Sequence, residues 1–218
     1  MNELVTKFND SLVISSADVI GDYLELGIDS VMDNEILKEV PIFKSLLSVI
    51  NICGNIRERN CLKNLTIFIN ELNSGNIQTE KLKLHQEELK NNPKKAEKEL
   101  GRILIILDQT IDNQKAFYYG KLYKAYINGL INWDLFVEFC EINDRLYIGD
   151  FKLLALIYNK SINDTTNRND LYKIERLNSV GVIGLAPKSI RIGRSNSRQD
   201  SYISLNETGR LYTTIIFN

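Results

Sequence analysis

The chain has 218 residues, of which 44% are hydrophobic and 25% charged, and its formal net charge is -1. This is the composition of an ordinary globular protein, and it excludes the polyelectrolyte character that would by itself identify a partner. The length is sufficient for a real core and favours two domains.

The opening residues, MNELVTKFNDSLVISS, contain acids and lack the basic region, apolar core and cleavage site of a signal peptide. Synthesis and residence in the cytoplasm are therefore the default expectation. The many Asn and Ile residues, with only three Pro, are typical of an AT-rich bacterial coding sequence. From Ser15 to Met32, apolar residues at helical spacing predict an amphipathic helix whose acidic face is solvated rather than metal-binding.

The most apolar stretch is Val40 to Ile56, VPIFKSLLSVINICGNI, in which Lys44 is the only charged residue. As a helix it would be roughly 26 Å long, slightly short of a hydrocarbon core of about 30 Å. A buried central helix of a bundle is the favoured interpretation, and a helix that enters a membrane once several copies assemble is the alternative. The membrane or pore residues would then be Phe43, Lys44, Leu46, Leu47, Val49 and Ile50.

Helical periodicity continues after this stretch. The charged residues Arg57 to Asn60 predict a break, and Cys61 to Leu72 the next helix. Charges of both signs from Thr79 to Arg102 predict two short exposed helices, broken before Pro93. The apolar block Ile103 to Leu107 predicts a separate buried helix.

A helix from Gln114 to Leu130 carries four tyrosines among lysines: Tyr118, Tyr119, Tyr123 and Tyr126. Such tyrosines can stack on single-stranded nucleic acid. More often they are core residues while the lysines extend to water, and we favour the core interpretation. Asn132 is expected to cap the following helix, whose packed face includes Phe136 and Phe139.

Catalytic and metal-binding signals are lacking. The only histidine, His85, is expected to be exposed with no neighbour to orient it. Cys53, Cys61 and Cys140 follow no metal-ligand spacing and predict free thiols, of which Cys53 and Cys61 lie in apolar helical patterns. There is also no glycine-rich phosphate loop. We expect neither an enzyme nor a cofactor.

The pattern changes after Gly149. Helices are predicted over 150–158 and 171–180, the second ending at Gly181, with a polar loop between them. Short strands are then expected at 182–185, 189–192 and 202–205, with a tip at 193–197, and a last helix over 206–217.

The run ERLNSVGVI, followed by YISLNETGRLY, resembles the end of winged-helix domains over about residues 150–218. The resemblance implies that the helix before the hairpin reads bases and that the hairpin is the wing. Not all three helices that usually precede the wing are evident, so the loop Ser161 to Asp170 would have to contain one.

Basic residues gather in this region without an acid between Lys188 and Arg198. They suit phosphate contacts, although an exposed hairpin can also be basic simply to keep its edge soluble. The predicted nucleic-acid-binding residues are Lys173, Arg176, Lys188, Arg191, Arg194 and Arg198.

The segments DNEILKEVPIFKSLLSVINICGNIRERNCLKNLTIFINEL and KAFYYGKLYKAYINGLINWDLF look like small bacterial proteins of uncharacterised role. The combination of an apolar N-terminal helix with a nucleic-acid-like C-terminal module is similar to membrane effectors of Hailong-type anti-phage systems. That resemblance implies an oligomeric ion channel, which a DNA oligomer keeps closed and which opens when this ligand is lost.

Together these patterns predict a mainly α protein, with a helical domain over 1–148 and a winged-helix-like module carrying a β-hairpin over 149–218. The first functional hypothesis is a homo-oligomeric membrane-active effector of anti-phage defence at the inner membrane, controlled by a nucleic-acid or nucleotide ligand. The second is a cytoplasmic winged-helix DNA-binding regulator or adaptor. The third is a bundle that binds only a protein partner.

Overall fold

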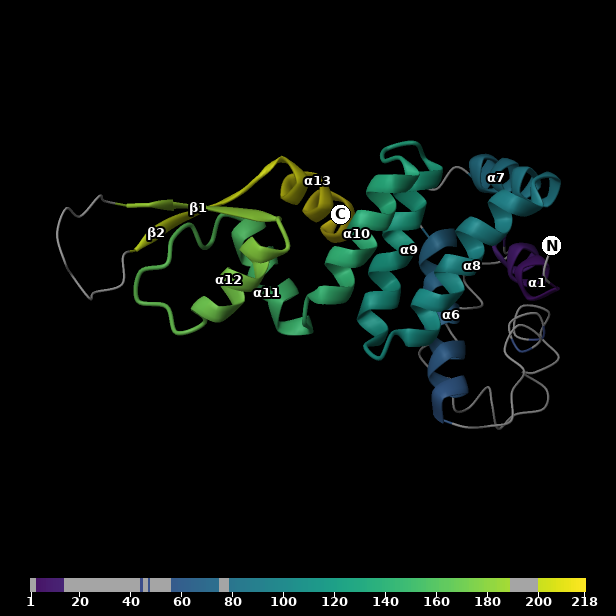
Figure 1. Cartoon of the computed structure of the whole chain (residues 1–218), viewed down its shortest axis with the longest axis horizontal. Helices are drawn as coiled ribbons and strands as arrows, with labels where there is room; N and C mark the ends of the chain where they lie inside the picture. The colour runs from purple at the N-terminus through teal and green to yellow at the C-terminus, as the bar shows by residue number, and fades with distance from the viewer. Residues whose placement is uncertain (1–2, 14–43, 45–46, 48–55, 75–78, 189–199) are drawn as a thin grey trace. The chain divides into compact units, whose positions relative to one another are not determined.

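A computed structural model describes residues 3–13, 44, 47, 56–74, 79–188 and 200–218. The described part is mainly α-helical with one small antiparallel hairpin near its C-terminal end, which confirms the expected fold class (Figure 1). The chain divides into two compact units, Met1–Val137 and Glu138–Asn218. The sequence pattern placed the division after residue 148 instead.

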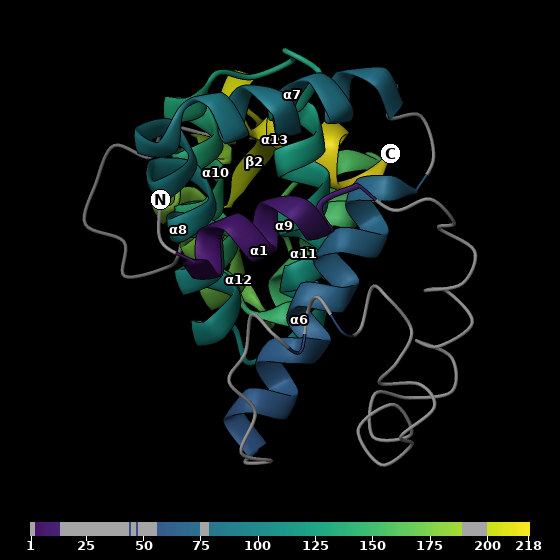
Figure 2. The ribbon, with the colours of Figure 1, turned by 90° about the vertical axis from the view of Figure 1, so that its right-hand side faces the viewer.

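The N-terminal unit is a bundle in which α6 packs against α8 and α9, and α1 packs against α7 and α8 (Figure 2). Reciprocal hydrogen bonds hold α1 to α7, because the side-chain amides of Asn9 and Gln86 each donate to the other residue's backbone carbonyl. The helices of this bundle are α1 (Glu3–Ser11), α6 (Ile56–Asn73), α7 (Thr79–Asn91), α8 (Pro93–Gln109), α9 (Asn113–Ile127) and the first part of α10 (Trp133–Arg145).

Helices α6 and α9 approach closely at Gly120. A Cβ atom there would lie 2.9 Å from the Cβ of Glu71 and 3.0 Å from the carbonyl oxygen of Phe68. Lys124, one turn further along α9, donates to Glu71 at 2.8 Å. The small residue and this ion pair therefore fix the spacing and alignment of the two helices.

The predicted break before Pro93 is confirmed, since α7 ends at Asn91 and Pro93 begins α8. Asn92 caps α8 by accepting from the backbone N–H of Lys95. The expectation that both helices are exposed is wrong. Leu82, Leu89 and Leu100 are buried. Leu82 and Leu89 are seven residues, or about two turns, apart on α7, and Ala96 lies four residues before Leu100 on α8, so the apolar residues lie on one side of each helix.

Two other predicted boundaries are also wrong. The predicted helix does not begin at Cys61, because Arg57–Asn60 already belong to the first turn of α6, where the guanidinium of Arg57 pairs with Asp108. The apolar block Ile103 to Leu107 is not a separate helix, because α8 continues through it.

The C-terminal unit contains the rest of α10 and a helix, hairpin and helix arrangement. The register of the two strands pairs Ile183 with Leu205 and Pro187 with Ser201. Its further elements are α11 (Ile148–Tyr158), α12 (Leu171–Ser179), β1 (Ile183–Pro187), β2 (Ser201–Leu205) and α13 (Glu207–Phe217).

Tight backbone contacts join α12, the hairpin and α13. Gly181 ends α12 with φ of 78°, as predicted, and the N–H of Val182 donates to the carbonyl of Leu177. Asn206 caps α13 by accepting from the N–H of Gly209 and also donates to the carbonyl of Gly181. A Cβ at Gly209 would lie 1.8 Å from the carbonyl oxygen of Val182, so only glycine fits.

The loop Ser161 to Asp170 contains no helix, so the expectation that it holds one is wrong. It lies along β2 instead: Asp164 forms an isolated antiparallel bridge with Tyr202, and the N–H of Thr165 donates to the carbonyl of Ser201. The loop therefore extends the hairpin beside β2 by a single residue pair.

The predicted helix Ser15 to Met32 lies outside the described residues, as do Phe43, Leu46, Val49 and Ile50. Lys44 and Leu47 are both helical, the lysine exposed and the leucine partly exposed. None of the helices in the described ranges has the length and apolarity needed to cross a membrane.

Candidate functional site

Aromatic and basic side chains gather where α12 meets the start of α11. We call Tyr147, Tyr172, Lys173 and Arg176 the α12 face. Tyr147 and Tyr172 are 62% and 58% exposed, which is unusual for side chains of this size. The guanidinium of Arg176 lies 4.4 Å from the ring centroid of Tyr147 and 5.7 Å from that of Tyr172. The arginine therefore holds both rings in place by cation–π contacts.

Arg176 also neutralises a buried acid. Its Nε and Nη2 atoms donate to the two carboxylate oxygens of Asp150 at 2.7 and 2.9 Å, and Asp150 is fully buried. Asp150 accepts a further hydrogen bond from the backbone N–H of Tyr147 at the start of α11. The bond to Asp150 raises the pKa of the Arg176 guanidinium. This residue, predicted to bind nucleic acid, therefore also joins α12 to α11.

Of the two cations of the α12 face, Lys173 has the fewer contacts with other side chains. Its Nζ atom lies 5.9 Å from the ring centroid of Tyr172, and no carboxylate of the described ranges forms an ion pair with it. It is close to the backbone as well, because a Cβ at Gly149 would lie 3.2 Å from Nζ. An ammonium group beside an exposed aromatic ring can contact a phosphate without first breaking an ion pair.

Lys188 follows β1 and is paired within the unit. Its Nζ atom donates to Asp164 at 2.7 Å and to the Thr166 hydroxyl at 2.8 Å, and it lies 5.3 Å from the ring centroid of Tyr202. The same hydrogen bond raises the pKa of Lys188 and lowers the pKa of Asp164. Lys188 therefore fastens the base of the hairpin to the preceding loop.

The other predicted contacts, Arg191, Arg194 and Arg198, lie outside the described residues. The hairpin nevertheless fixes where their segment starts and ends, because the N–H of Lys188 donates to the carbonyl of Asp200 at 2.9 Å. Residues 189–199 join these two positions, and their sequence contains three arginines and no acid.

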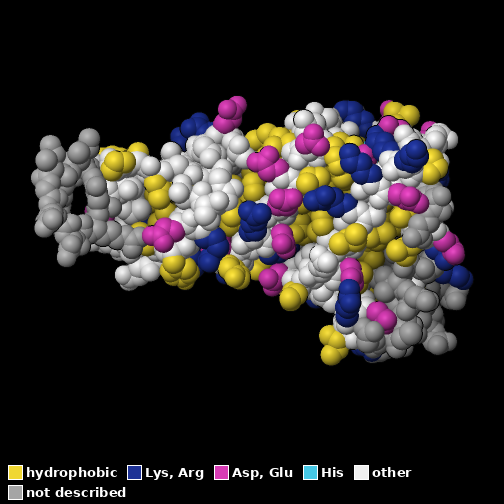
Figure 3. Space-filling view, in the orientation of Figure 1, with side chains coloured by type: hydrophobic (Ala, Val, Ile, Leu, Met, Phe, Trp, Pro, Cys, Tyr) yellow, Lys and Arg dark blue, Asp and Glu magenta, His cyan; other side chains and the backbone are white. Residues whose placement is uncertain are grey.

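Charge is mixed on the face of the molecule that Figure 3 shows. The face in Figure 3 shows basic and acidic side chains interspersed rather than gathered by sign. Residues 138–218 contain eleven Lys and Arg against nine Asp and Glu, so the unit is only slightly basic. Any binding of a polyanion must therefore come from a local cluster, and the segment from Lys188 to Arg198 is the densest one in this unit's sequence.

The tyrosines of α9 are core residues, as predicted. Tyr118, Tyr119 and Tyr123 are at most 5% exposed, so they offer no stacking surface. Tyr126, which is partly exposed, contacts Trp133 and Phe136 at the start of α10. The packing also confirms that Asn132 caps α10, because it accepts from the N–H of Leu135.

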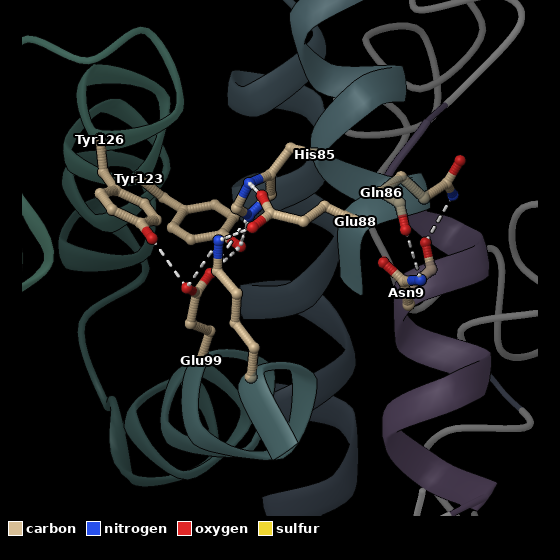
Figure 4. Close-up of polar contacts among 8 residues, drawn as sticks. Asn9, His85, Gln86, Glu88, Glu99, Tyr123 and Tyr126 are labelled. Atoms are coloured by element: carbon tan, nitrogen blue, oxygen red, sulfur yellow. Dashed lines mark hydrogen bonds and ion pairs between the residues drawn. The ribbon is translucent and has the colours of Figure 1, made fainter. Parts of the chain in front are cut away.

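The expectation for His85 is wrong. It is only 9% exposed, and its Nε2 atom lies 2.9 Å from the Tyr123 hydroxyl and 3.2 Å from the Glu99 carboxylate (Figure 4). Either tautomer of His85 can hydrogen-bond the Tyr123 hydroxyl, which both donates and accepts, whereas the Glu99 carboxylate can only accept. These contacts could not be predicted from the sequence, because the two partners lie 14 and 38 residues away on other helices.

Glu99 is the centre of this buried network. It is 3% exposed and accepts hydrogen bonds from Tyr126 at 2.7 Å and from Tyr123 at 3.5 Å. Burial, followed by the nearby Glu99 charge, raises the pKa of Tyr123, and burial and the Glu99 hydrogen bond raise that of Tyr126. The hydroxyls thus stay protonated and joined to their partners. This network connects α7, α8 and α9, and it is built like a structural core rather than an open catalytic centre.

Among the described residues, no three His, Cys, Asp or Glu side chains lie close enough together to hold a metal ion. Cys61 and Cys140 are buried free thiols, as predicted, and burial raises the pKa of Cys61 to about 11. A thiol of that pKa is a poor nucleophile at neutral pH. Cys53 lies outside the described residues.

Sequence reasoning missed the exposed tyrosines. Tyr147, Tyr172 and Tyr202 each lie beside a predicted cation, and the adjacent pair Tyr172 and Lys173 was the available signal. The predicted cations are only partly brought together: Lys173 and Arg176 share the α12 face, whereas Lys188 belongs to the base of the hairpin. No protein-family model, curated protein or solved structure matches the chain.

Proposed function

We propose that the chain is a nucleic-acid-binding regulator or adaptor that acts through its C-terminal unit. The observation that carries the proposal is the antiparallel hairpin directly after α12, whose paired strand ends are joined by a segment with three arginines and no acid. An aromatic and basic helix followed by a basic hairpin is the pairing of recognition helix and wing that the sequence resembles.

The two parts would contribute differently. Arg191, Arg194 and Arg198 supply charge for phosphate contacts, which give affinity without sequence preference. Tyr172 and Lys173 supply an exposed ring and an adjacent ammonium group, which suit an unpaired base and its phosphate. Arg176 contributes indirectly, because it holds Tyr172 while it neutralises Asp150.

The test is fluorescence anisotropy of labelled single-stranded and double-stranded DNA with the full chain, as salt is varied. With about four phosphate contacts, the logarithm of the binding constant for duplex should fall with the logarithm of salt concentration at a slope of about −4. The double variant Arg191→Glu, Arg194→Glu should lose most of the affinity for both probes.

A matched control makes the same formal charge change elsewhere in the unit. Arg145 and Lys152 are exposed on α10 and α11, so Arg145→Glu, Lys152→Glu should bind almost as tightly as the unchanged chain. Equal losses in the two double variants would mean that only net charge matters. Absence of binding to either probe at low salt would contradict the proposal and favour a module that binds a protein partner.

The hypothesis of a homo-oligomeric membrane channel in anti-phage defence depends on Val40 to Ile56, of which only Lys44, Leu47 and Ile56 are described. It stays a proposal from the sequence. It shares the nucleic-acid-binding module with the regulator, so the anisotropy experiment does not separate the two, and membrane recovery does.

A further inference from the structure

A pocket of 480 Å³ opens in the C-terminal unit, between the end of α11, the loop after it, β2 and α13. Its volume is typical of sites that hold small molecules, which measure about 300–1,000 Å³. No residue of the α12 face lines it. It is therefore a feature separate from the proposed nucleic-acid interface.

One part of the pocket is apolar. Its lining includes the aliphatic side chains of Ile157, Ile162, Ile203 and Leu205. Ile157 and Ile203 are nearly fully buried, so these walls belong to the packed core of the unit and are already in place. Such a surface favours the apolar body of a ligand, because burying it releases water from both partners.

The charged lining has a single sign. Lys160 and Arg210 line the pocket, and no Asp or Glu does. Lys160 is exposed and forms no ion pair with any residue of the described ranges. Arg210 uses Nε to donate to the carbonyl of Leu205 at 3.3 Å, while a guanidinium carries further N–H donors. The pocket therefore presents two positive charges beside an apolar wall.

The positions of these two cations are unusual for their elements. Lys160 follows α11 with φ of 58°, a left-handed conformation in which glycine is usual because other residues are strained. Arg210 lies near the N-terminus of α13, the end where the helix dipole least favours a cation. The conformation of Lys160 caps α11, because its N–H donates to the carbonyl of Ile157 and that of Ser161 donates to the carbonyl of Leu156. The helix dipole, in contrast, does not explain the cation at Arg210.

We propose that this pocket binds a small molecule with an apolar body and one anionic group, a carboxylate or a phosphate. The apolar body packs on Ile157 and Ile203, and Lys160 and Arg210 bind the anion by charge-assisted hydrogen bonds. Asn163 and Ser204, which also line the pocket, provide neutral donors and acceptors that orient the ligand. The proposal does not depend on nucleic-acid binding.

The test uses 8-anilinonaphthalene-1-sulfonate, an aromatic anion whose fluorescence rises in apolar sites, titrated into the full chain. Saturable binding of one molecule per chain is expected, and Lys160→Gln, Arg210→Gln should weaken it at least tenfold. Arg145→Gln, Lys152→Gln removes two cations outside the pocket and should leave it unchanged. The neutral analogue N-phenyl-1-naphthylamine should bind the cation variant and the unchanged chain alike.

A second variant, Thr214→Trp, keeps both cations and fills the pocket with an indole, because Thr214 lines it from the exposed side of α13. Thr214→Trp should abolish the saturable fluorescence signal. If circular dichroism shows that the cation variant is unfolded, this second variant alone tests the proposal. Displacement by decanoate or by decyl phosphate then identifies the anionic group. Equal binding by the unchanged chain and the folded pocket variants would overturn the proposal, as would no saturable binding.

Discussion

His85 and Glu99 illustrate how a buried polar pair can stabilise a helical bundle. Neither side chain is more than 9% exposed, and each has a partner on another helix. A buried hydrogen bond contributes only about 1 kcal/mol net, but a partner left unpaired costs roughly 1–3 kcal/mol. The network therefore contributes more by excluding misaligned packings than by adding attraction.

Replacing His85 by Ala should lower the free energy of unfolding of the N-terminal unit by about 1–3 kcal/mol, because Glu99 and Tyr123 each lose a buried partner. Trp133, the only tryptophan, packs against Tyr126 in this unit, so its fluorescence in a urea titration measures the change. Lys83→Ala on the exposed side of α7 is the control and should cost under about 0.5 kcal/mol. Equal effects would show that the network is not structural.

Alkaline pH should destabilise the same unit. The pKa values of Tyr123 and Tyr126 are raised in the folded state, mainly by burial. The unfolded chain therefore loses these protons first, near pH 10. The stability that they contribute is fully present below about pH 10 and is lost as the pH rises towards the folded-state pKa values.

Tyr123→Phe should make this decline shallower between about pH 10 and 11, since each titrating group adds at most about 1.4 kcal/mol per pH unit. Urea titrations followed by Trp133 fluorescence at several pH values measure the slope. Tyr147→Phe changes an exposed tyrosine of the other unit and should leave the slope as it is. An unchanged slope in Tyr123→Phe would contradict the raised pKa.

At the scale of the elements, the sequence predicted well where a local signal is decisive. The break before Pro93, the helix end at Gly181 and the start of the last helix at Asn206 lie where expected, because local hydrogen bonds determine each of them. The burial of α7 and α8 was missed, since charged residues outnumber the leucines there and burial depends on helices distant in sequence. The pairing of Arg176 with Asp150 is likewise set by packing, across 26 residues.

Two glycines on neighbouring helices provide a matched test of helix packing. Gly120→Ala should cost about 1–3 kcal/mol, because its Cβ would meet Glu71 at 2.9 Å and push α9 from α6. Gly101→Ala in α8 should instead stabilise by up to about 1 kcal/mol, because nothing lies within 4 Å of the added atom.

Both variants are measured by urea unfolding with Trp133 fluorescence. Because the chemical change is identical, opposite signs would isolate the close approach of α6 and α9 as the cause. A stabilising Gly120→Ala would mean that the two helices can move apart without cost.

At the scale of the whole molecule, the sequence predicted a mainly α protein with a hairpin near its C-terminal end, and the described ranges confirm it. The candidate site was predicted less fully. Cation positions are visible in a sequence, but their ion pairs are not. Lys188 and Lys173 therefore looked equivalent, although of these two only Lys188 forms an ion pair within the described ranges. Exposed tyrosines also look like core tyrosines until the packing is known.

The hypothesis of membrane entry is a question about the whole molecule, because it requires several copies to shelter Lys44. One helix over Val40 to Ile56 would be roughly 26 Å long, less than a hydrocarbon core of about 30 Å. Lys44, the fifth residue of this stretch, would also have to leave water, and a lysine in the hydrocarbon region costs about 2.5 kcal/mol or more at mid-depth. We therefore expect the full chain, expressed in bacteria and fractionated by ultracentrifugation, to remain in the supernatant.

Leu46→Asp, Val49→Asp separates the possible outcomes. If the segment is a buried core helix, two buried carboxylates should lower the stability of the chain and leave its distribution between supernatant and membrane unchanged. Recovery of the unchanged chain with the membranes, lost in this variant while circular dichroism shows the same helicity, would contradict our expectation and support the channel. Because neither result depends on the arginines of the hairpin, the regulator proposed here is then tested separately by its DNA affinity.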